Sequence, residues 1–72
     1  MKIIDNDFLT EREKDIVLFL LEGKTKKEIA KILALSVSTV KTNIENIYRK
    51  FNVHNKIELL TFVIKNKIVE LV

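Results

Sequence analysis

Four short motifs in the sequence each mark the start of a helix. Thr10, Thr25 and Asn55 are each followed three residues later by a glutamate, so that a side chain and a backbone N–H group can cap each other reciprocally. Ser36 is a fourth cap residue, with Thr39 at the third position in place of an acid. The sequence therefore predicts four helices, at about residues 11–21, 26–33, 37–51 and 56–65.

The composition agrees with an all-helical fold. The 72 residues include no proline and one glycine, whereas sheets and long loops use more of both. A hydrophobic content of 47% is too high for a disordered chain. We therefore expect a single all-α domain, a four-helix bundle over residues 1–72, with residues 1–8 as an N-terminal extension. Such a small domain buries a low fraction of its surface, which makes a partner chain plausible.

The residue content disfavours several classes of protein. Without cysteine the chain can form neither disulfides nor thiolate metal sites, and its apolar runs are too short to span a bilayer. His54 is the only histidine, and no nucleophile or metal-ligand pattern surrounds it. We expect no enzymatic activity, no metal, no cofactor and no membrane partner, and a location in the cytosol.

Apolar residues recur every three or four positions in the predicted helices, which gives each helix an inward face. Gly23 and Asn52 are suited to end the first and third helices, because both residue types tolerate a left-handed conformation. The residues expected to face the core, including two in the C-terminal tail, are Ile16, Val17, Leu20, Ile29, Ile32, Leu33, Val37, Val40, Ile44, Ile47, Phe51, Ile57, Leu60, Ile64, Ile68 and Leu71.

The net charge of +3 is unevenly distributed. Residues 1–23 carry three basic and six acidic side chains, residues 24–56 carry eight basic and two acidic ones, and residues 57–72 are balanced. Clustered positive charge suits a polyanion partner, although a solvated basic surface is an equally simple explanation. The basic segment holds a short helix, a three-residue link and a longer helix, which is the arrangement of a helix-turn-helix.

The helix predicted at residues 37–51 has a polar face opposite its apolar one. This face carries hydroxyl, amide and charged groups of the kinds that contact base edges and phosphates. The N-termini of this helix and of the one before it could also attract phosphate. An ordinary solvated helix face is the alternative. The candidate nucleic-acid contacts are Lys26, Lys27, Ser36, Ser38, Thr39, Lys41, Thr42, Asn43, Glu45, Asn46 and Arg49.

Three segments of the chain together resemble one known family. They are "LTEREKDIVLFLLEGKTKKEIAKIL", "LSVSTVKTNIENIYRKFNV" and "NKIEL", in that order and spacing. The sequence is similar here to the LuxR-type (GerE-like) helix-turn-helix domain of bacterial transcription regulators. The similarity runs from Leu9 to about Ile68, and the combination "LTxRE", "KEIA" and "SxxTVK" is specific.

The resemblance implies a sequence-specific DNA-binding regulator whose recognition helix lies at residues 37–51. It also implies contacts in the first half of that helix and dimerisation through the helix at residues 56–65 on an inverted-repeat site. The chain departs from the family pattern at Asn43, where histidine is common, and at Glu45, where relatives are often basic or polar. Glu45 could accept a hydrogen bond from cytosine N4 or could pair with Lys41 or Arg49 along the helix.

The helix at residues 56–65 has more apolar residues than one inward face needs. A patch of this kind on a small domain indicates an interface. We expect a homodimer whose contacts include Leu59, Phe62 and Val63.

Two other functions fit parts of the pattern. Region four of sigma factors shares the "EIA" and "TVK" segments, although it normally ends soon after the recognition helix, whereas a capped fourth helix follows here. A helical bundle that binds only proteins is the second alternative. The preferred reading is a cytoplasmic, nucleoid-associated bacterial regulator that binds double-stranded DNA as a homodimer, with RNA polymerase as a further candidate partner.

Overall fold

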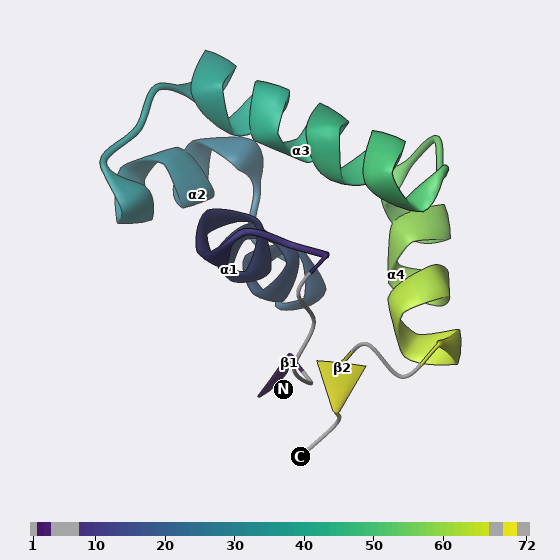
Figure 1. The fold of residues 1–72 in the computed structure, drawn as a ribbon. Helices are drawn as coiled ribbons and strands as arrows, with labels where there is room; N and C mark the ends of the chain where they lie inside the picture. The colour runs from purple at the N-terminus through teal and green to yellow at the C-terminus, as the bar shows by residue number, and fades with distance from the viewer. Residues whose placement is uncertain (1, 4–7, 67–68, 71–72) are drawn as a thin grey trace.

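The computed structural model describes residues 2–3, 8–66 and 69–70 of the chain. It contains helices α1 (Glu11–Leu21), α2 (Lys26–Leu33), α3 (Val37–Phe51) and α4 (Lys56–Lys65) (Figure 1). The all-α fold and the bounds of all four helices are confirmed. The expected packing of Ile68 and Leu71 lies outside the described residues.

The helix starts follow the cap motifs. Thr10 and Thr25 each form a complete capping box with the glutamate three residues later, and Ser36 accepts the N–H of Thr39 at 3.0 Å. Asn55 also caps α4, but Glu58 departs from the expected reciprocal pattern. Its carboxylate accepts the N–H of His54 at 2.8 Å, so the return bond reaches one residue further upstream.

Three residues with positive φ separate the helices. Gly23 follows α1 with φ of 85°, and Asn52 ends α3 with φ of 55°, as predicted. Ala34 ends α2 with φ of 56°, although its Cβ makes this left-handed conformation unfavourable. The backbone therefore turns between α2 and α3 with a residue that is less suited to the turn than glycine.

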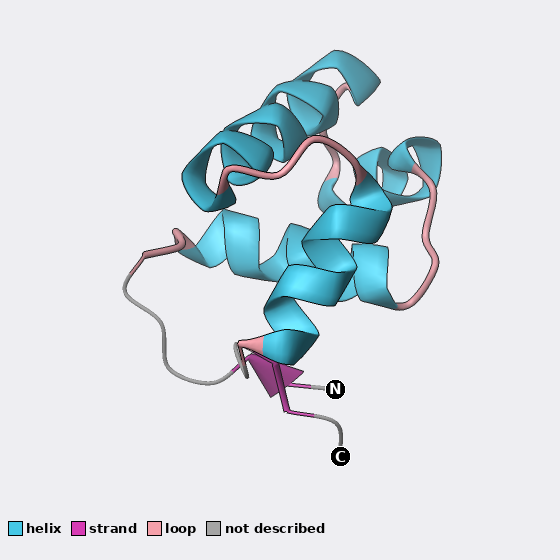
Figure 2. Ribbon diagram, turned by 90° about the vertical axis from the view of Figure 1, so that its right-hand side faces the viewer, coloured by secondary structure: helices cyan, strands magenta, loops and turns pink. Residues whose placement is uncertain are grey.

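The core lies where α1, α2 and α3 meet, and α4 packs against the C-terminal end of α3 (Figures 1 and 2). α3 runs across one side of the molecule, so that one of its faces is buried and the other faces solvent. The buried apolar side chains are Leu9, Ile16, Val17, Leu20, Ile29, Ala30, Val40, Ile44, Ile47, Phe51, Leu59 and Val63.

The expected inward face of α4 is wrong. Leu59 and Val63 are fully buried, whereas Ile57 is 77% exposed and Ile64 is 47% exposed. Leu60, the third residue expected to face inward, is half-buried. The apolar residues of α4 surround the helix, so packing against α3 rather than periodicity decides its orientation.

Two further core predictions are also wrong. Ile32 is 52% exposed, because α2 packs through Ile29 and Ala30 with Leu33 beside them. Val37 is 44% exposed at the first turn of α3, one turn before the buried side chain of Val40. Both residues lie next to the turn between α2 and α3.

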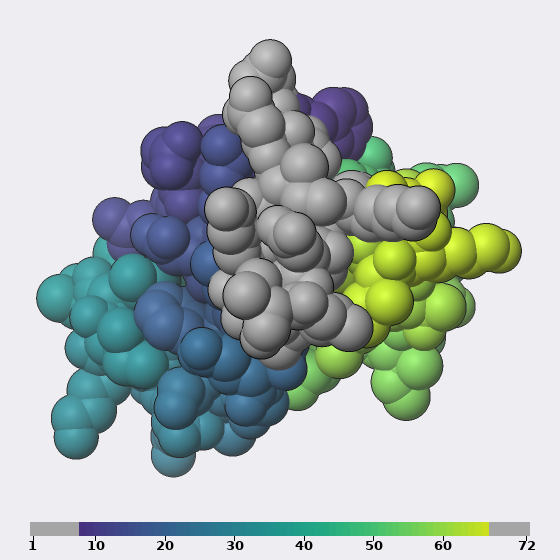
Figure 3. All heavy atoms as spheres, turned by 90° about the horizontal axis from the view of Figure 1, so that it is seen from below, coloured from purple at the N-terminus to yellow at the C-terminus, as the bar shows by residue number. Residues whose placement is uncertain are grey.

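The termini form a short strand pair that the sequence did not predict. β1 (Lys2–Ile3) pairs antiparallel with β2 (Val69–Glu70), on the side of the molecule away from α3 (Figure 1). Seen from that side, the side chains of α1 and α2 gather on one flank and those of α4 on the other (Figure 3). None of the helices within residues 8–66 is long and apolar enough to cross a membrane.

Candidate nucleic-acid interface

The solvent-facing surface of α3 carries a stripe of polar side chains. Ser38, Thr42, Glu45 and Arg49 follow one another at steps of three or four residues, and all four are exposed. Lys41 is exposed beside the stripe. The opposite face is fixed by buried apolar residues at the same spacing, so core packing determines which side chains α3 presents.

The hydroxyl and amide groups of the first half of α3 bind its own backbone and cap. The Ser36 hydroxyl donates to Thr39 Oγ1 at 2.8 Å, and the Thr42 hydroxyl donates to the Ser38 carbonyl at 3.0 Å. Asn43 Nδ2 donates to the Thr39 carbonyl at 2.9 Å. The Thr42 hydroxyl has thereby used its one proton and keeps its oxygen lone pairs for other partners, whereas Asn43 keeps its amide oxygen and its second N–H.

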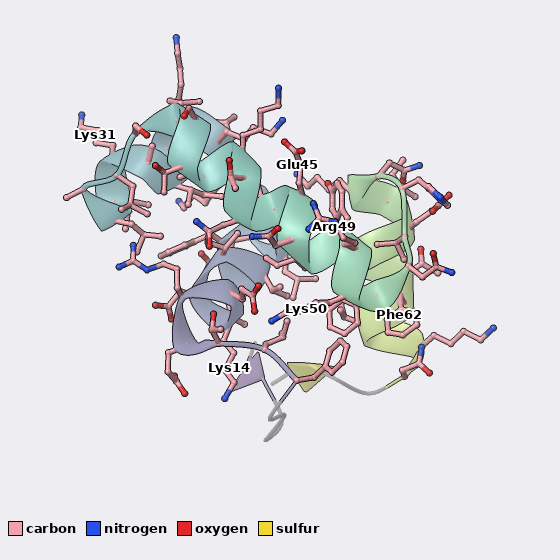
Figure 4. The ribbon with its side chains drawn as sticks, turned by 45° about the horizontal axis from the view of Figure 1, so that its top comes forward. Lys14, Lys31, Glu45, Arg49, Lys50 and Phe62 are labelled. Carbon is pink, nitrogen blue, oxygen red and sulfur yellow. The ribbon has the colours of Figure 1, made fainter. Side chains whose placement is uncertain are left out.

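In the second half of α3, more of the polar side chains are engaged with other side chains of the protein. Arg49 Nη1 donates to Asn46 Oδ1 at 3.0 Å, and Asn46 itself is half-buried. Lys50 turns away from the stripe toward α1, where its Nζ lies 2.5 Å from Glu13 Oε1 (Figure 4). Of the cations in this half, Arg49 is the one that lies on the outward face.

Glu45 projects from the middle of the stripe (Figure 4). Within residues 8–66, the ion pairs with a nitrogen–oxygen distance of 4.0 Å or less do not include it. The carboxylate therefore pairs with neither Lys41 nor Arg49 in this structure, although both stand four residues away on the helix. One of the two interpretations of Glu45 from the sequence, intrahelical pairing, is not what the structure contains.

α2 carries further positive charge at its first and last turns. Lys26 and Lys27 occupy its first two positions and are exposed, and Lys31 extends into solvent from its last turn (Figure 4). Glu28 caps this helix, and bonds from the backbone and hydroxyl of Thr25 lower the pKa of its carboxyl group. Glu28 is therefore charged at neutral pH, and its carboxylate accepts the backbone N–H of Thr25 at the start of the helix.

Tyr48 packs against the core at the edge of α3 and is half-buried. Burial raises the pKa of its hydroxyl group, so the side chain is neutral at physiological pH. We assign Tyr48 to packing.

α4 presents a separate apolar surface. Phe62, half-buried, stacks on Phe51 with 5.1 Å between ring centroids, and Leu59 and Val63 have no exposed surface. The expectation that Leu59 and Val63 face outward is therefore wrong. A groove of about 490 Å³ runs along the helix and is lined by Val53, Ile57, Glu58, Thr61, Phe62, Lys65 and Asn66.

The sequence missed Ile57 and Ile64 as surface residues, and no signal in the apolar pattern of α4 distinguishes them from the buried ones. His54 is exposed, with its Nδ1 3.3 Å from Glu58 Oε1. In the described part of the chain, no three side chains of histidine, aspartate or glutamate are grouped as metal ligands.

Comparison with known families gives a match over most of the chain. Residues 7–63 match the family model described as bacterial regulatory proteins, luxR family. The chain is 36% identical to the transcriptional regulatory protein LiaR of Bacillus subtilis (strain 168) over 66 residues, which is 92% of this chain and 31% of LiaR. It is 45% identical to the nitrate/nitrite response regulator protein NarP of Escherichia coli (strain K12) over 49 residues, 68% of this chain and 23% of NarP.

Solved structures show the same fold. The phage VqmA–DPO complex superposes with a TM-score of 0.81 at 41% identity, covering 89% of this chain and 29% of that one. The Vibrio cholerae VqmA dimer superposes with a TM-score of 0.78 at 29% identity, covering 81% and 26%. The chain thus spans between a quarter and a third of the length of most of these relatives and neighbours.

Proposed function

The chain belongs to the LuxR family of bacterial regulatory proteins, and from this premise we propose that it regulates transcription by binding double-stranded DNA. α3 enters the major groove with its outward stripe, and the start of α2 lies against the phosphate backbone. The observation that carries the proposal is the stripe of α3 itself. It is polar and exposed from Ser38 to Arg49, about three turns, while the opposite face of the same helix anchors it in the core.

Base contacts come from the first half of α3. Lys41 and Thr42 are exposed there, and Ser38, Thr39 and Asn43 flank them. A lysine donates to guanine O6 and N7, and the thymine methyl group fits an apolar contact such as the threonine methyl. Arg49 and Asn46 lie further along the helix, and we assign them a secondary part at the edge of the groove.

Phosphate contacts come from the start of α2 and the cap of α3. Lys26 and Lys27 are charged and exposed, and the Ser36 hydroxyl lies at a helix N-terminus. These groups fix the orientation of α3 in the groove without reading sequence.

A dimer of this chain binds an inverted repeat through α4. The exposed side chains Ile57 and Ile64, together with the groove beside Phe62, supply the apolar surface. The related V. cholerae protein is described as a dimer in the absence of its target DNA, which supports dimerisation. Leu59 and Val63 act on this interface only indirectly, because their buried side chains hold α4 against the core.

The cellular setting follows from the proposed partner. The protein acts in the bacterial cytoplasm, associated with the nucleoid, and RNA polymerase is the further partner that an activator of transcription would contact.

Selection of duplexes from a random pool by the purified chain tests the proposal. We expect enrichment of an inverted repeat, and affinity that falls steeply as salt rises, because lysines release counterions from DNA. A chain that enriches no sequence, or whose binding is independent of salt, would contradict the proposal and favour a module that binds only proteins.

Two lysine variants sharpen this test. Lys41→Ala should weaken binding to the selected site by about 1–3 kcal/mol and relax its sequence preference. Lys14→Ala is the matched control, because Lys14 lies on the other side of the molecule and pairs with Glu11 at 3.3 Å (Figure 4). Equal affinity of the two variants, both folded by circular dichroism, would remove Lys41 from the interface.

A further inference from the structure

Glu45 is an unusual group for a surface that binds DNA. It is exposed at the centre of the α3 stripe, with Lys41 one turn before it and Arg49 one turn after it. Neither cation neutralises it, and Arg49 Nη1 instead donates to Asn46 Oδ1 at 3.0 Å. The carboxylate thus points into solvent with its full acceptor capacity (Figure 4).

The proposed function makes this position costly for an acid. In a major groove the carboxylate would approach a polyanion, and phosphates would repel it. A hydrogen-bond donor on a base edge can offset that repulsion, because charge-assisted bonds are stronger than neutral ones. Glu45 lies on the stripe one turn after Lys41, which we place at a base, so its position favours a base that offers a donor.

The neighbouring threonine presents the same kind of group. Thr42 lies three residues before Glu45 on the stripe, and its hydroxyl proton is committed to the Ser38 carbonyl at 3.0 Å. Its oxygen therefore presents lone pairs outward. Two acceptors stand side by side, one turn apart, and together they suit a part of the groove where amino groups project.

We propose that Glu45 determines DNA specificity by accepting a hydrogen bond from the N4 amino group of cytosine. Cytosine offers only this donor in the major groove, whereas the amino group of adenine stands beside the N7 acceptor. A carboxylate has no proton to donate to N7. Opposite adenine, a lone pair of the Glu45 carboxylate would therefore face the lone pair of N7, which is unfavourable. The inference rests on the proposed function and adds the base that one position of the half-site must contain.

The test measures binding to a panel of duplexes that differ from the selected site by one base pair at a time. For the wild-type chain we expect one position, next to the base pair contacted by Lys41, where cytosine is preferred by about 5- to 100-fold. Glu45→Ala should lose the preference at this position and keep it elsewhere. Glu45→Gln should shift the preference there to adenine, because an amide can pair with both N6 and N7.

Glu11→Gln is the matched control for the loss of one negative charge. Glu11 pairs with Lys14, and Lys14 lies away from Glu45 (Figure 4). This variant should keep every base preference of the wild-type chain.

The outcomes separate the inference from the function on which it rests. If Glu45→Ala binds all duplexes more tightly by one common factor, with the cytosine preference intact, the carboxylate acts only by repulsion and the inference is overturned. A wild-type preference for adenine at the position released by Glu45→Ala also overturns it. A wild-type chain that discriminates among no duplexes overturns the proposed function itself.

Discussion

Glu13 is a buried charged side chain between α1 and α3. It is 4% exposed, and its Oε1 lies 2.5 Å from Lys50 Nζ on α3 and 2.9 Å from the backbone nitrogen of Thr10. Lys50 also donates to the Phe8 carbonyl at 3.2 Å. One carboxylate thus caps α1 and joins it to α3.

The pair should make stability depend on pH. Burial raises the pKa of Glu13, but the hydrogen bonds from Lys50 and Thr10 outweigh it, and the net pKa lies below the ordinary value of about 4.3. A lowered folded pKa contributes stability that is complete above the unfolded pKa and is lost as pH falls through the folded one. We therefore expect the free energy of unfolding, measured in urea, to fall as pH drops below about 4.3.

Lys50→Met tests the origin of this dependence. Without the lysine, burial raises the pKa of folded Glu13 toward its unfolded value, so stability at neutral pH should fall by about 1–3 kcal/mol and the further loss of stability below about pH 4.3 should become smaller. Lys14→Met is the control, because its partner Glu11 is 91% exposed and the pair should contribute about 0–1 kcal/mol. If Lys50→Met lost as much stability on acidification as the wild-type chain does, the pair would not set the pKa of Glu13.

At the scale of elements, the sequence predicted where helices begin and end but not how α4 is turned. Caps are local, because Thr10, Thr25 and Ser36 bond to groups three residues away. The orientation of α4 depends on contacts with distant residues, such as the ring of Phe51 against that of Phe62. A helix that is apolar on several sides offers no periodic signal from which its buried face could be chosen.

In the candidate interface, too, local features could be predicted from the sequence and features that depend on distant contacts could not. The first half of the α3 stripe could be predicted, because its polar positions alternate with a regular buried face. The commitment of Lys50 to Glu13 joins residues 37 positions apart, and the sequence gives no local sign of it. The half-burial of Asn46 likewise depends on how α1 packs beneath α3, so its part in binding could not be judged from spacing.

The backbone of Ala34, in the turn between α2 and α3, is strained, and a glycine at this position would relieve the strain. Ala34 has φ of 56°, a conformation that costs an alanine about 1–2 kcal/mol. Ala34→Gly should raise the free energy of unfolding by about 0.5–1 kcal/mol, after the greater freedom of glycine in the unfolded chain is subtracted. Chemical denaturation measures this difference.

The same substitution inside α2 serves as the control. Ala30→Gly should lower stability by at least about 0.5–1 kcal/mol, because Ala30 is helical and buried. If Ala34→Gly destabilised the chain as much as Ala30→Gly does, the left-handed turn would not be a source of strain.

At the scale of the whole molecule, the chain has two exposed surfaces of different character. The polar stripe lies along α3, and the apolar surface of α4 lies beyond the end of that helix (Figure 1). Two copies joined through α4 would carry two stripes at a fixed separation, and that separation would set the spacing of the half-sites. The dimer and the inverted repeat are therefore one geometric proposal.

Ile57→Glu tests the dimer without disturbing the core, since Ile57 is 77% exposed whereas Phe62 stacks on Phe51 at 5.1 Å. The measured quantity is cooperativity, the ratio of affinity for the inverted repeat to affinity for a single half-site. We expect Ile57→Glu to reduce this ratio at least tenfold, because a charge would be buried in the interface at a cost of about 1.4 kcal/mol or more. Ile32→Glu places the same charge at an exposed isoleucine of α2 and should leave the ratio unchanged, even if it weakens binding to each half-site. Equal cooperativity in Ile57→Glu and the wild-type chain would exclude α4 as the dimer contact.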